Sequence, residues 1–212
     1  MSQFVVLHGA AGSGKGTISK ALVQLDYNLI GAGEEIRQYI ATNGLEDQLA
    51  FRMHQKLAVG LNVETADLFE VIEKKIIALT GQNILGDGLV RESDQASWLA
   101  NFSEQSEAAT KFINLVAPFD VLNERLLNRY FVPGNPFPFL SYEDALSECQ
   151  EGVTPIARQD DNPDAIQSRF RQYEEKLQPI IEIISSSPNI EYIEIDANNP
   201  PHTVLSDVIL AI

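Results

Sequence analysis

The stretch Gly9-Ala-Ala-Gly-Ser-Gly-Lys-Gly-Thr17 decides the fold of this 212-residue chain. It follows an apolar run at residues 4–8, and a pattern with helical periodicity, residues 16–24, comes after it. In a glycine-rich turn between a strand and a helix, backbone N–H groups converge on a phosphate, and the helix N-terminus adds a positive dipole. The stretch therefore predicts a phosphate-binding loop (P-loop) whose Lys15 reaches the β- and γ-phosphates of a nucleotide.

The residue after this lysine differs from the strict P-loop motif, which has Ser or Thr there. Gly16 stands at that position and Thr17 follows it. Direct coordination of Mg²⁺ by the hydroxyl is therefore not expected. The loop residues expected to bind the nucleotide are Gly12, Ser13, Gly14, Lys15, Gly16 and Thr17.

Five short apolar runs, separated by longer stretches with helical periodicity, predict a parallel sheet with right-handed crossovers. The expected strands are residues 4–8, 27–31, 83–86, 112–117 and 190–195. The expected helices are residues 16–24, 34–42, 66–79, 121–130, 169–185 and 203–212. This alternation predicts an α/β fold, a three-layer sandwich around a five-stranded parallel sheet.

Composition excludes several classes of protein. A net charge of −15 argues against a general nucleic-acid binder, because neutralising phosphates needs a basic surface. No run approaches the roughly 18 apolar residues that a membrane span requires, and the first residues do not resemble a signal peptide. The single cysteine, Cys149, excludes a disulfide within the chain. We expect one cytoplasmic domain that binds neither nucleic acid nor membrane.

Residues 131–152 depart from this alternation. Three prolines, Pro133, Pro136 and Pro138, prevent a regular helix or central strand, and no Lys or Arg lies between Tyr130 and Ala157. A long segment of this kind in a compact domain predicts a lid rather than a plain surface loop. The side chains expected to form a small apolar cluster within it are Phe131, Phe137, Phe139, Leu140 and Tyr142.

The variant Gly14-Lys-Gly-Thr17 resembles the adenylate kinase family of nucleoside monophosphate kinases. Other family motifs have counterparts in matching order along the chain. They are Gly31-Ala-Gly-Glu-Glu-Ile-Arg37, Asp87-Gly-Leu-Val-Arg-Glu-Ser-Asp-Gln-Ala96, Asn123-Glu-Arg-Leu-Leu-Asn-Arg129, Arg158-Gln-Asp-Asp161 with Arg169, and Asp196-Ala-Asn-Asn-Pro200.

The resemblance implies an organisation, an activity and a site. It implies one P-loop kinase domain, 1–212, with a core of residues 1–31, 79–129 and 159–212. A nucleoside-monophosphate-binding (NMP-binding) insertion of about 32–78 and a lid of about 130–158 complete the domain. The activity is reversible, Mg²⁺-dependent transfer from ATP to AMP giving two ADP, by a monomer without structural zinc.

The implied catalytic residues are Lys15, Arg91, Arg129, Arg158 and Arg169, with Asp160 and Asp161 holding the last arginines in place. ATP would contact the P-loop residues together with Arg125, Arg129, Asn198 and Pro200. AMP would contact Ala32, Arg37, Val63, Gly88, Arg91, Gln95, Arg158 and Arg169. Asp87 would lie near the waters of Mg²⁺.

A charge count supports a cationic pocket without reference to the family. The chain has only fifteen basic residues, and seven of them occupy these motif positions. Six of the seven are arginines, whose planar fork suits bidentate phosphate contacts. An exposed ion pair is the usual role of any one arginine, but the order and spacing of the set favour a site.

Departures from the family pattern concern the acceptor. Ala32 replaces the usual threonine beside the AMP base, Leu61 stands near a common lysine, and Leu89-Val90 replaces Phe-Pro. Two alternatives therefore stay open: a kinase of another nucleoside monophosphate or small metabolite, and a non-catalytic adenine nucleotide sensor. His8 at the end of the first strand is expected to be a packed residue rather than a catalyst.

Overall fold

The computed structural model describes residues 2–58, 63–106, 108–135, 139–157 and 161–212. Its five strands are β1 (Gln3–Gly9), β2 (Asn28–Gly31), β3 (Ile84–Asp87), β4 (Ala109–Val116) and β5 (Ile190–Asp196). Its helices are α1 (Lys15–Val23), α2 (Ala32–Asn43), α3 (Gln48–Ala58), α4 (Thr65–Ala78), α5 (Ser93–Gln105), α6 (Phe119–Leu127), α7 (Tyr142–Ser147), α8 (Pro163–Ser186) and α9 (Pro201–Ala211).

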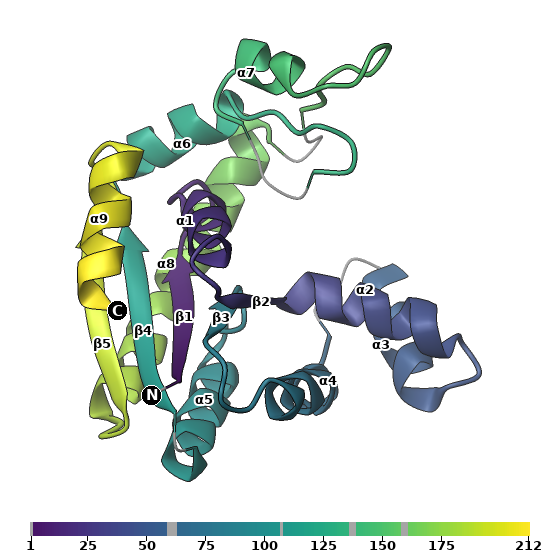
Figure 1. Ribbon diagram of the computed structural model, residues 1–212, viewed down its shortest axis with the longest axis vertical. Helices are drawn as coiled ribbons and strands as arrows, with labels where there is room; N and C mark the ends of the chain where they lie inside the picture. Colours follow the sequence, from purple (N-terminus) through teal and green to yellow (C-terminus); the bar gives the residue numbers. More distant parts are fainter. Residues whose placement is uncertain (1, 59–62, 107, 136–138, 158–160) are drawn as a thin grey trace.

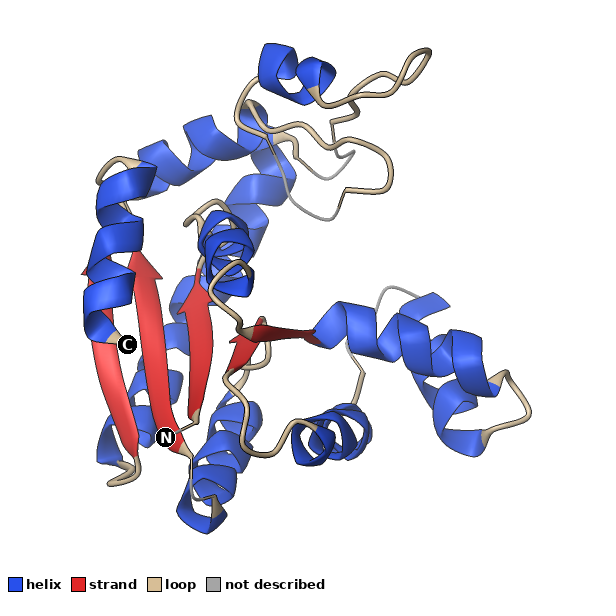
Figure 2. Cartoon of the chain, viewed as in Figure 1, coloured by secondary structure: helices blue, strands red, loops and turns tan. Residues whose placement is uncertain are grey.

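All strand pairs in the sheet are parallel, in the order β2-β3-β1-β4-β5 (Figures 1 and 2). The expected α/β sandwich with five parallel strands is confirmed. Central β1 is buried from Phe4 to Leu7, as its uninterrupted apolar sequence requires of a strand covered on both faces. The switch in strand order between β1 and β3 opens the sheet at its carboxyl edge, where the P-loop follows β1.

Side chains of β1 alternate between two cores, because successive residues of a strand point to opposite faces. Phe4 and Val6 belong to the larger core, with side chains of α4, α5 and α8. Val5 and Leu7 belong to the smaller core, with side chains of α1 and α9. The two helical layers thus anchor the P-loop strand from both sides.

Several helix boundaries differ from the expectation. α3, α5 and α7 are additional helices, and α8 begins at Pro163 rather than at residue 169. The start of α8 has a clear local cause: the Asn162 side chain accepts a hydrogen bond from the Ala165 N–H at 3.0 Å, and Pro163 occupies the first turn. α6 ends at Leu127, and Tyr130 instead forms an antiparallel bridge with Phe139.

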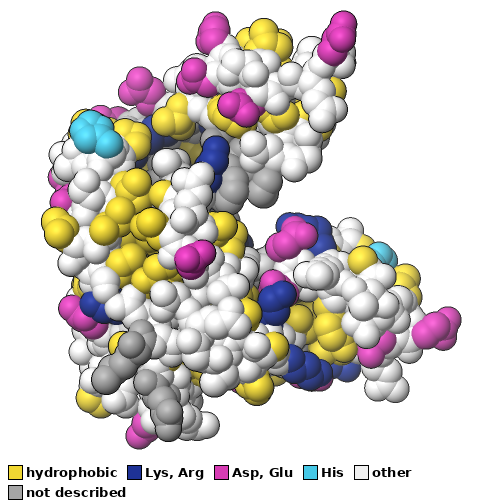
Figure 3. Space-filling view, in the orientation of Figure 1, with side chains coloured by type: hydrophobic (Ala, Val, Ile, Leu, Met, Phe, Trp, Pro, Cys, Tyr) yellow, Lys and Arg dark blue, Asp and Glu magenta, His cyan; other side chains and the backbone are white. Residues whose placement is uncertain are grey.

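Two parts of the molecule project from the core on either side of an opening (Figure 1). One is formed by α2, α3 and α4, which pack together and are joined by the ion pair between Arg52 of α3 and Asp67 of α4. The other is the chain between α6 and α8, which carries α7. In the space-filling view the molecule is hollowed between them, and Lys and Arg side chains lie at the margin of the hollow (Figure 3).

Of the five side chains expected to form an apolar cluster between α6 and α8, the structure describes Phe131, Phe139, Leu140 and Tyr142. Leu140 is 51% exposed, and Tyr142 packs edge-on against Tyr130. Phe131 lies against the Arg129 guanidinium, whereas Phe139 faces the ammonium group of Lys20. Cationic neighbours therefore lie over two of these rings, and Phe137 lies outside the described residues.

Candidate active site

The P-loop has a backbone that glycine makes possible. Gly9, Gly12 and Gly14 have φ angles of 140°, 85° and 97°. A Cβ at Gly9 would lie 2.6 Å from the Leu115 carbonyl oxygen, and one at Gly12 would lie 2.9 Å from that of Leu122. Gly14 caps α1 without a side-chain hydrogen bond, so no capping side chain competes with an anion at the start of the helix.

Lys15 lies folded over its own loop. Its Nζ donates to the carbonyl oxygens of Gly9 at 2.6 Å and Ala10 at 2.9 Å. Burial lowers the pKa of Lys15 to about 8, and the positive charges of Arg91 and Arg129 act in the same direction while Asp87 opposes them. Two arginines far apart in the sequence therefore lie within electrostatic range of the P-loop lysine.

Asp87 ends β3 beside α1. Its Oδ2 accepts a hydrogen bond from the Ser19 hydroxyl at 3.4 Å, while Thr17 is exposed in the first turn of the helix. In the described part of the chain, no three His, Cys, Asp or Glu side chains are grouped so as to hold a metal ion. A single carboxylate beside a P-loop suits Mg²⁺ that is carried in by nucleotide phosphates.

Arg91 follows β3 on a turn fixed by its neighbours. Its backbone N–H donates to Oε1 of Gln95 at 2.7 Å, and Gln95 is only 6% exposed. Gly88, at φ 67°, lies beneath the guanidinium group, and a Cβ there would approach Arg91 Nη2 to 2.8 Å. The turn holds the backbone of Arg91 and leaves its side chain exposed.

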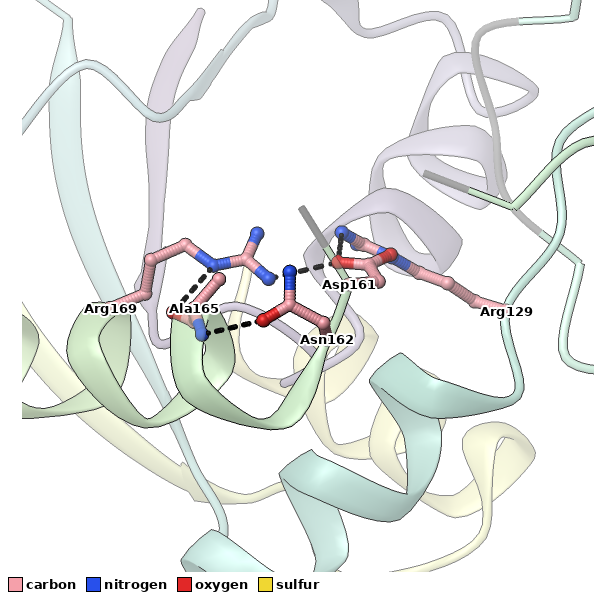
Figure 4. Close-up of polar contacts among 5 residues, drawn as sticks. All are labelled: Arg129, Asp161, Asn162, Ala165 and Arg169. Carbon is pink, nitrogen blue, oxygen red and sulfur yellow. Dashed lines mark hydrogen bonds and ion pairs between the residues drawn. The ribbon is translucent and has the colours of Figure 1, made fainter. Parts of the chain in front are cut away.

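Arg129 and Arg169 share one carboxylate (Figure 4). Arg129 donates Nε to Asp161 Oδ2 at 2.5 Å and Nη2 to Oδ1 at 2.9 Å, and Arg169 Nη2 also donates to Oδ1 at 2.9 Å. The Asp161 side chain is only 3% exposed. Burial alone would raise its pKa, but the two arginines outweigh that effect and hold the pKa of Asp161 below its usual value.

Arg125 connects α6 to the loop after β5. Its Nη1 donates to the carbonyl oxygen of buried Ala197 at 2.8 Å. Asn198 and Pro200 follow in the same loop and are exposed. The predicted donor-base residues from two distant segments thus lie together.

The remaining predicted acceptor residues lie on or next to the helices of the first projection. Arg37 is exposed on α2 and forms an ion pair with Glu34 at 2.8 Å. Ala32 opens α2 and is 7% exposed, and Val63 before α4 is 8% exposed. Arg158, Asp160 and Leu61 lie outside the described residues.

Sequence patterns missed the residues that support this site. Ser19 binds Asp87, and the side chain of Lys176 on α8 forms an ion pair with Glu92 at 2.5 Å. Neither belongs to a motif, and their contacts exist only after distant segments fold together. The start of α8 does have a signal in the sequence, because Asn followed by Pro at residues 162–163 is typical of a helix N-cap and first turn.

A nucleotide-phosphate loop at the carboxyl edge of a parallel sheet, with a lysine approached by arginines from two other segments, defines the class: a P-loop phosphotransferase. The comparisons with known proteins give the family. Residues 7–188 match the family model described as adenylate kinase. The chain belongs to the adenylate kinase family, and its activity is phosphoryl transfer between ATP and AMP.

Curated relatives agree with this assignment. The chain is 28% identical to an adenylate kinase of Chlamydia muridarum, over 99% of this chain and 87% of that protein. It is 29% identical to a mitochondrial GTP:AMP phosphotransferase of Drosophila melanogaster, over 83% of this chain and 81% of the relative. An adenylate kinase of Mesoplasma florum is 24% identical over 98% and 99% of the two chains. Across the described ranges, no helix is both long and apolar enough to cross a membrane.

Proposed function

We propose that the chain transfers the γ-phosphoryl group reversibly from MgATP on the P-loop to AMP held between α2, α4 and the Arg91 turn, giving two ADP. The observation that carries this proposal is the P-loop with its lysine: Lys15 is bonded to its own loop carbonyls, and the charges of Arg91 and Arg129 from two other segments act on it. Phosphoryl transfer needs in-line positioning and neutralisation of charge on the migrating group, and such a grouping of cations would neutralise that charge. In this proposal about 32–78 is the NMP-binding insertion and about 130–158 the lid.

Each cation has a distinct proposed task. Lys15 leaves its loop carbonyls and binds the β- and γ-phosphates when ATP enters. Arg129 and Arg169, oriented by Asp161, face the phosphoryl group as its charge develops, together with Arg158. Arg37 and Arg91 bind the phosphate of AMP. No general base is needed, because the acceptor phosphate is already ionised at neutral pH.

Magnesium fits the residues at the end of β3. When bound with ATP, Mg²⁺ would offset the negative charge of the phosphates. Asp87 would hold its waters, and the Ser19 hydroxyl orients one oxygen of that carboxylate. Thr17 lies one residue beyond the usual position of the ligating hydroxyl, so we assign it to phosphate binding instead.

Acceptor choice rests on the pocket near the start of α2. Ala32, Val63 and Gln95 are the proposed base contacts, and Ala32 gives an apolar wall where the family usually has a hydroxyl. Gln95 is buried with Oε1 engaged by the Arg91 amide, which supports a task in holding Arg91 as well. The base contact of Gln95 stays a prediction.

The proposal extends to the state of the molecule. We propose that the protein is cytoplasmic. We also propose that it is a monomer, because all proposed catalytic groups come from one chain. The net charge of −15 supports a protein that does not bind nucleic acid or anionic membranes. Light scattering after gel filtration should give the mass of one chain, and a dimer mass would contradict the monomer.

One experiment tests the reaction. Purified protein with Mg²⁺ is given ATP or GTP as donor and AMP, CMP, UMP, GMP or dTMP as acceptor, with Lys15→Ala as the blank. ADP formation from ATP and AMP alone, lost in the blank and on chelation of Mg²⁺, supports the proposal. Transfer to another acceptor would relocate specificity to Ala32, and transfer from GTP alone would overturn the proposed donor.

A further inference from the structure

His8 lies at the carboxyl end of β1, directly before the P-loop. By strand alternation its side chain shares a face with Phe4 and Val6, and it is only 5% exposed. The imidazole is enclosed by two rings: Phe112 of β4, at 5.2 Å between centroids, and Tyr173 of α8, stacked at 5.6 Å. A polar ring at so enclosed a position has few choices of partner.

One hydrogen bond determines the state of this ring. His8 Nδ1 lies 3.1 Å from the carbonyl oxygen of Val90. A carbonyl only accepts, so Nδ1 carries the proton and Nε2 is bare. Nε2 has no hydrogen-bond partner among the described residues. Burial, with Lys15 and Arg91 adding to it against the Val90 bond, lowers the pKa of His8 to about 4, so the ring is neutral at pH 7.

The Val90 bond is one of three contacts that hold the segment around Arg91, two of them made by its backbone and one by the Glu92 side chain. His8 fixes Val90 before it, Gln95 accepts the N–H of Arg91 itself, and Lys176 of α8 pairs with Glu92 after it. No side-chain hydrogen bond is needed from the guanidinium for this arrangement. The turn is therefore fixed at three successive residues while the arginine side chain stays exposed.

His8 also contacts the helix that carries Arg169. Its stacking partner Tyr173 lies one turn after Arg169 on α8 and donates its hydroxyl to Oδ1 of Asn114 at 3.3 Å. Asn114 is fully buried and pairs with His8 in the β1–β4 register. The ring thus joins the P-loop strand, the Arg91 turn and α8 at one buried point.

We infer that His8 is a positioning residue for the acceptor side of the transfer, since it holds the Val90–Arg91 turn against β1 and against α8. The inference rests on the proposed task of Arg91 in binding the AMP phosphate. His8 touches no substrate in this assignment and acts through the backbone of Val90. The neutral Nδ1–H of His8 is the group that bonds to the Val90 carbonyl.

The test compares four variants of the full-length enzyme. His8→Leu replaces the Nδ1–H donor with an apolar side chain. His8→Asn restores an N–H near the Nδ1 position. Val6→Ala is the matched control, because Val6 is buried on the same face of β1 and its side chain has no hydrogen-bond donor to lose. Arg91→Ala reports separately on the proposed phosphate contact. The readouts are KM for AMP, KM for ATP, and NMR amide exchange of Arg91.

His8→Leu is expected to raise KM for AMP about three- to tenfold, the effect of one lost hydrogen bond, and to speed amide exchange at Arg91. KM for ATP should change less than about twofold, and His8→Asn should recover most of both effects. Val6→Ala should lower Tm without changing KM for AMP or amide exchange at Arg91. Unchanged exchange, unchanged KM for AMP, or the same changes in Val6→Ala would each overturn the inference. An unchanged KM for AMP in Arg91→Ala would overturn the proposed task of Arg91 in binding AMP. Amide exchange at Arg91 in His8→Leu would still show whether His8 holds the turn.

Discussion

Arg129 and Asp161 form a two-point ion pair between the end of α6 and the start of α8, with donor–acceptor distances of 2.5 and 2.9 Å. The carboxylate is nearly inaccessible, and Arg129 is 13% exposed in its side chain. Because both hydrogen bonds run parallel, the guanidinium plane has one orientation relative to the P-loop. Such a cation is oriented before the phosphoryl group arrives, which is the arrangement that transition-state stabilisation requires.

Arg129→Ala should lower turnover on the order of 10³-fold, by analogy with other arginines that stabilise transferring phosphoryl groups. KM for AMP should change by less than about threefold, because Arg129 is not assigned to the acceptor. Initial rates at saturating MgATP and varied AMP measure both. Arg171→Ala is the matched control, since Arg171 is exposed on α8 two residues from Arg169. Unchanged turnover in Arg129→Ala would remove Arg129 from the site.

ATP affinity should depend on pH through Lys15. The lysine has a pKa of about 8 in the free protein, and contact with phosphate favours its charged form and raises that pKa. Above pH 8 the free protein has lost this proton and must regain it on binding. The Kd for ATP should therefore rise up to about tenfold per pH unit above pH 8 and stay constant below.

Titration calorimetry from pH 7 to 9.5, in two buffers of different ionisation enthalpy, measures this Kd and the proton uptake together. Lys15→Arg is the control, because its guanidinium stays charged over the whole range and its affinity should show no such slope. A wild-type Kd that stays flat to pH 9.5, without proton uptake, would contradict the lowered pKa.

The strand limits followed from the sequence to within one residue at β1, where the apolar run is uninterrupted. The same holds at β5, although Glu191 and Glu194 lie there between apolar residues. The apolar pattern did not predict α5, because half of its buried side chains, Gln95 and Ser103, are polar and weaken the helical periodicity. β4 begins earlier than expected, because Thr110 and Lys111 read as polar but pair with β1 all the same. Contacts with distant segments, rather than the local apolar pattern, therefore determine α5 and the start of β4.

The sequence named candidate site residues but few of their contacts. The P-loop motif selected Lys15, and the family resemblance selected Arg91 and Arg129. The resemblance implied that Asp161 holds Arg169, and the structure has this contact. It did not imply the pair of Asp161 with Arg129, because these residues are 32 positions apart and only the fold brings them together. Motif identity assigned Gln95 to the acceptor base, yet its Oε1 accepts a backbone hydrogen bond, a role that depends on the local turn.

Acid should destabilise the protein through His8. Its folded-state pKa of about 4 lies below the ordinary value of 6.5, so between these values the unfolded chain binds more protons. The free energy of unfolding therefore rises with pH across this window and falls as pH drops, with a slope approaching about 1.4 kcal/mol per pH unit. The burial of the ring, and the nearby charges of Lys15 and Arg91, are the physical causes.

Urea denaturation from pH 4 to 7.5 checks this slope. His8→Leu should lose the part of it that belongs to the imidazole, because no group titrates at that position. His54→Leu is the comparison variant, since it removes an exposed histidine of α3 instead of the buried one. Parallel stability curves for wild type and His8→Leu would contradict the assignment.

Arg125→Ala should weaken the donor site rather than the transfer. The Arg125 side chain connects α6 to the Ala197 carbonyl, and the exposed residues Asn198 and Pro200 follow directly. Without that hydrogen bond the loop loses its tie to α6, so KM for ATP should rise about tenfold, while turnover at saturating ATP falls less than about threefold. Lys111→Ala is the matched control: Lys111 also donates to a backbone carbonyl, that of Ala211 at 2.6 Å, but on a strand outside the predicted site. It should lower Tm without changing either constant. A large fall in turnover with unchanged KM for ATP would instead assign Arg125 to the transferring phosphoryl group.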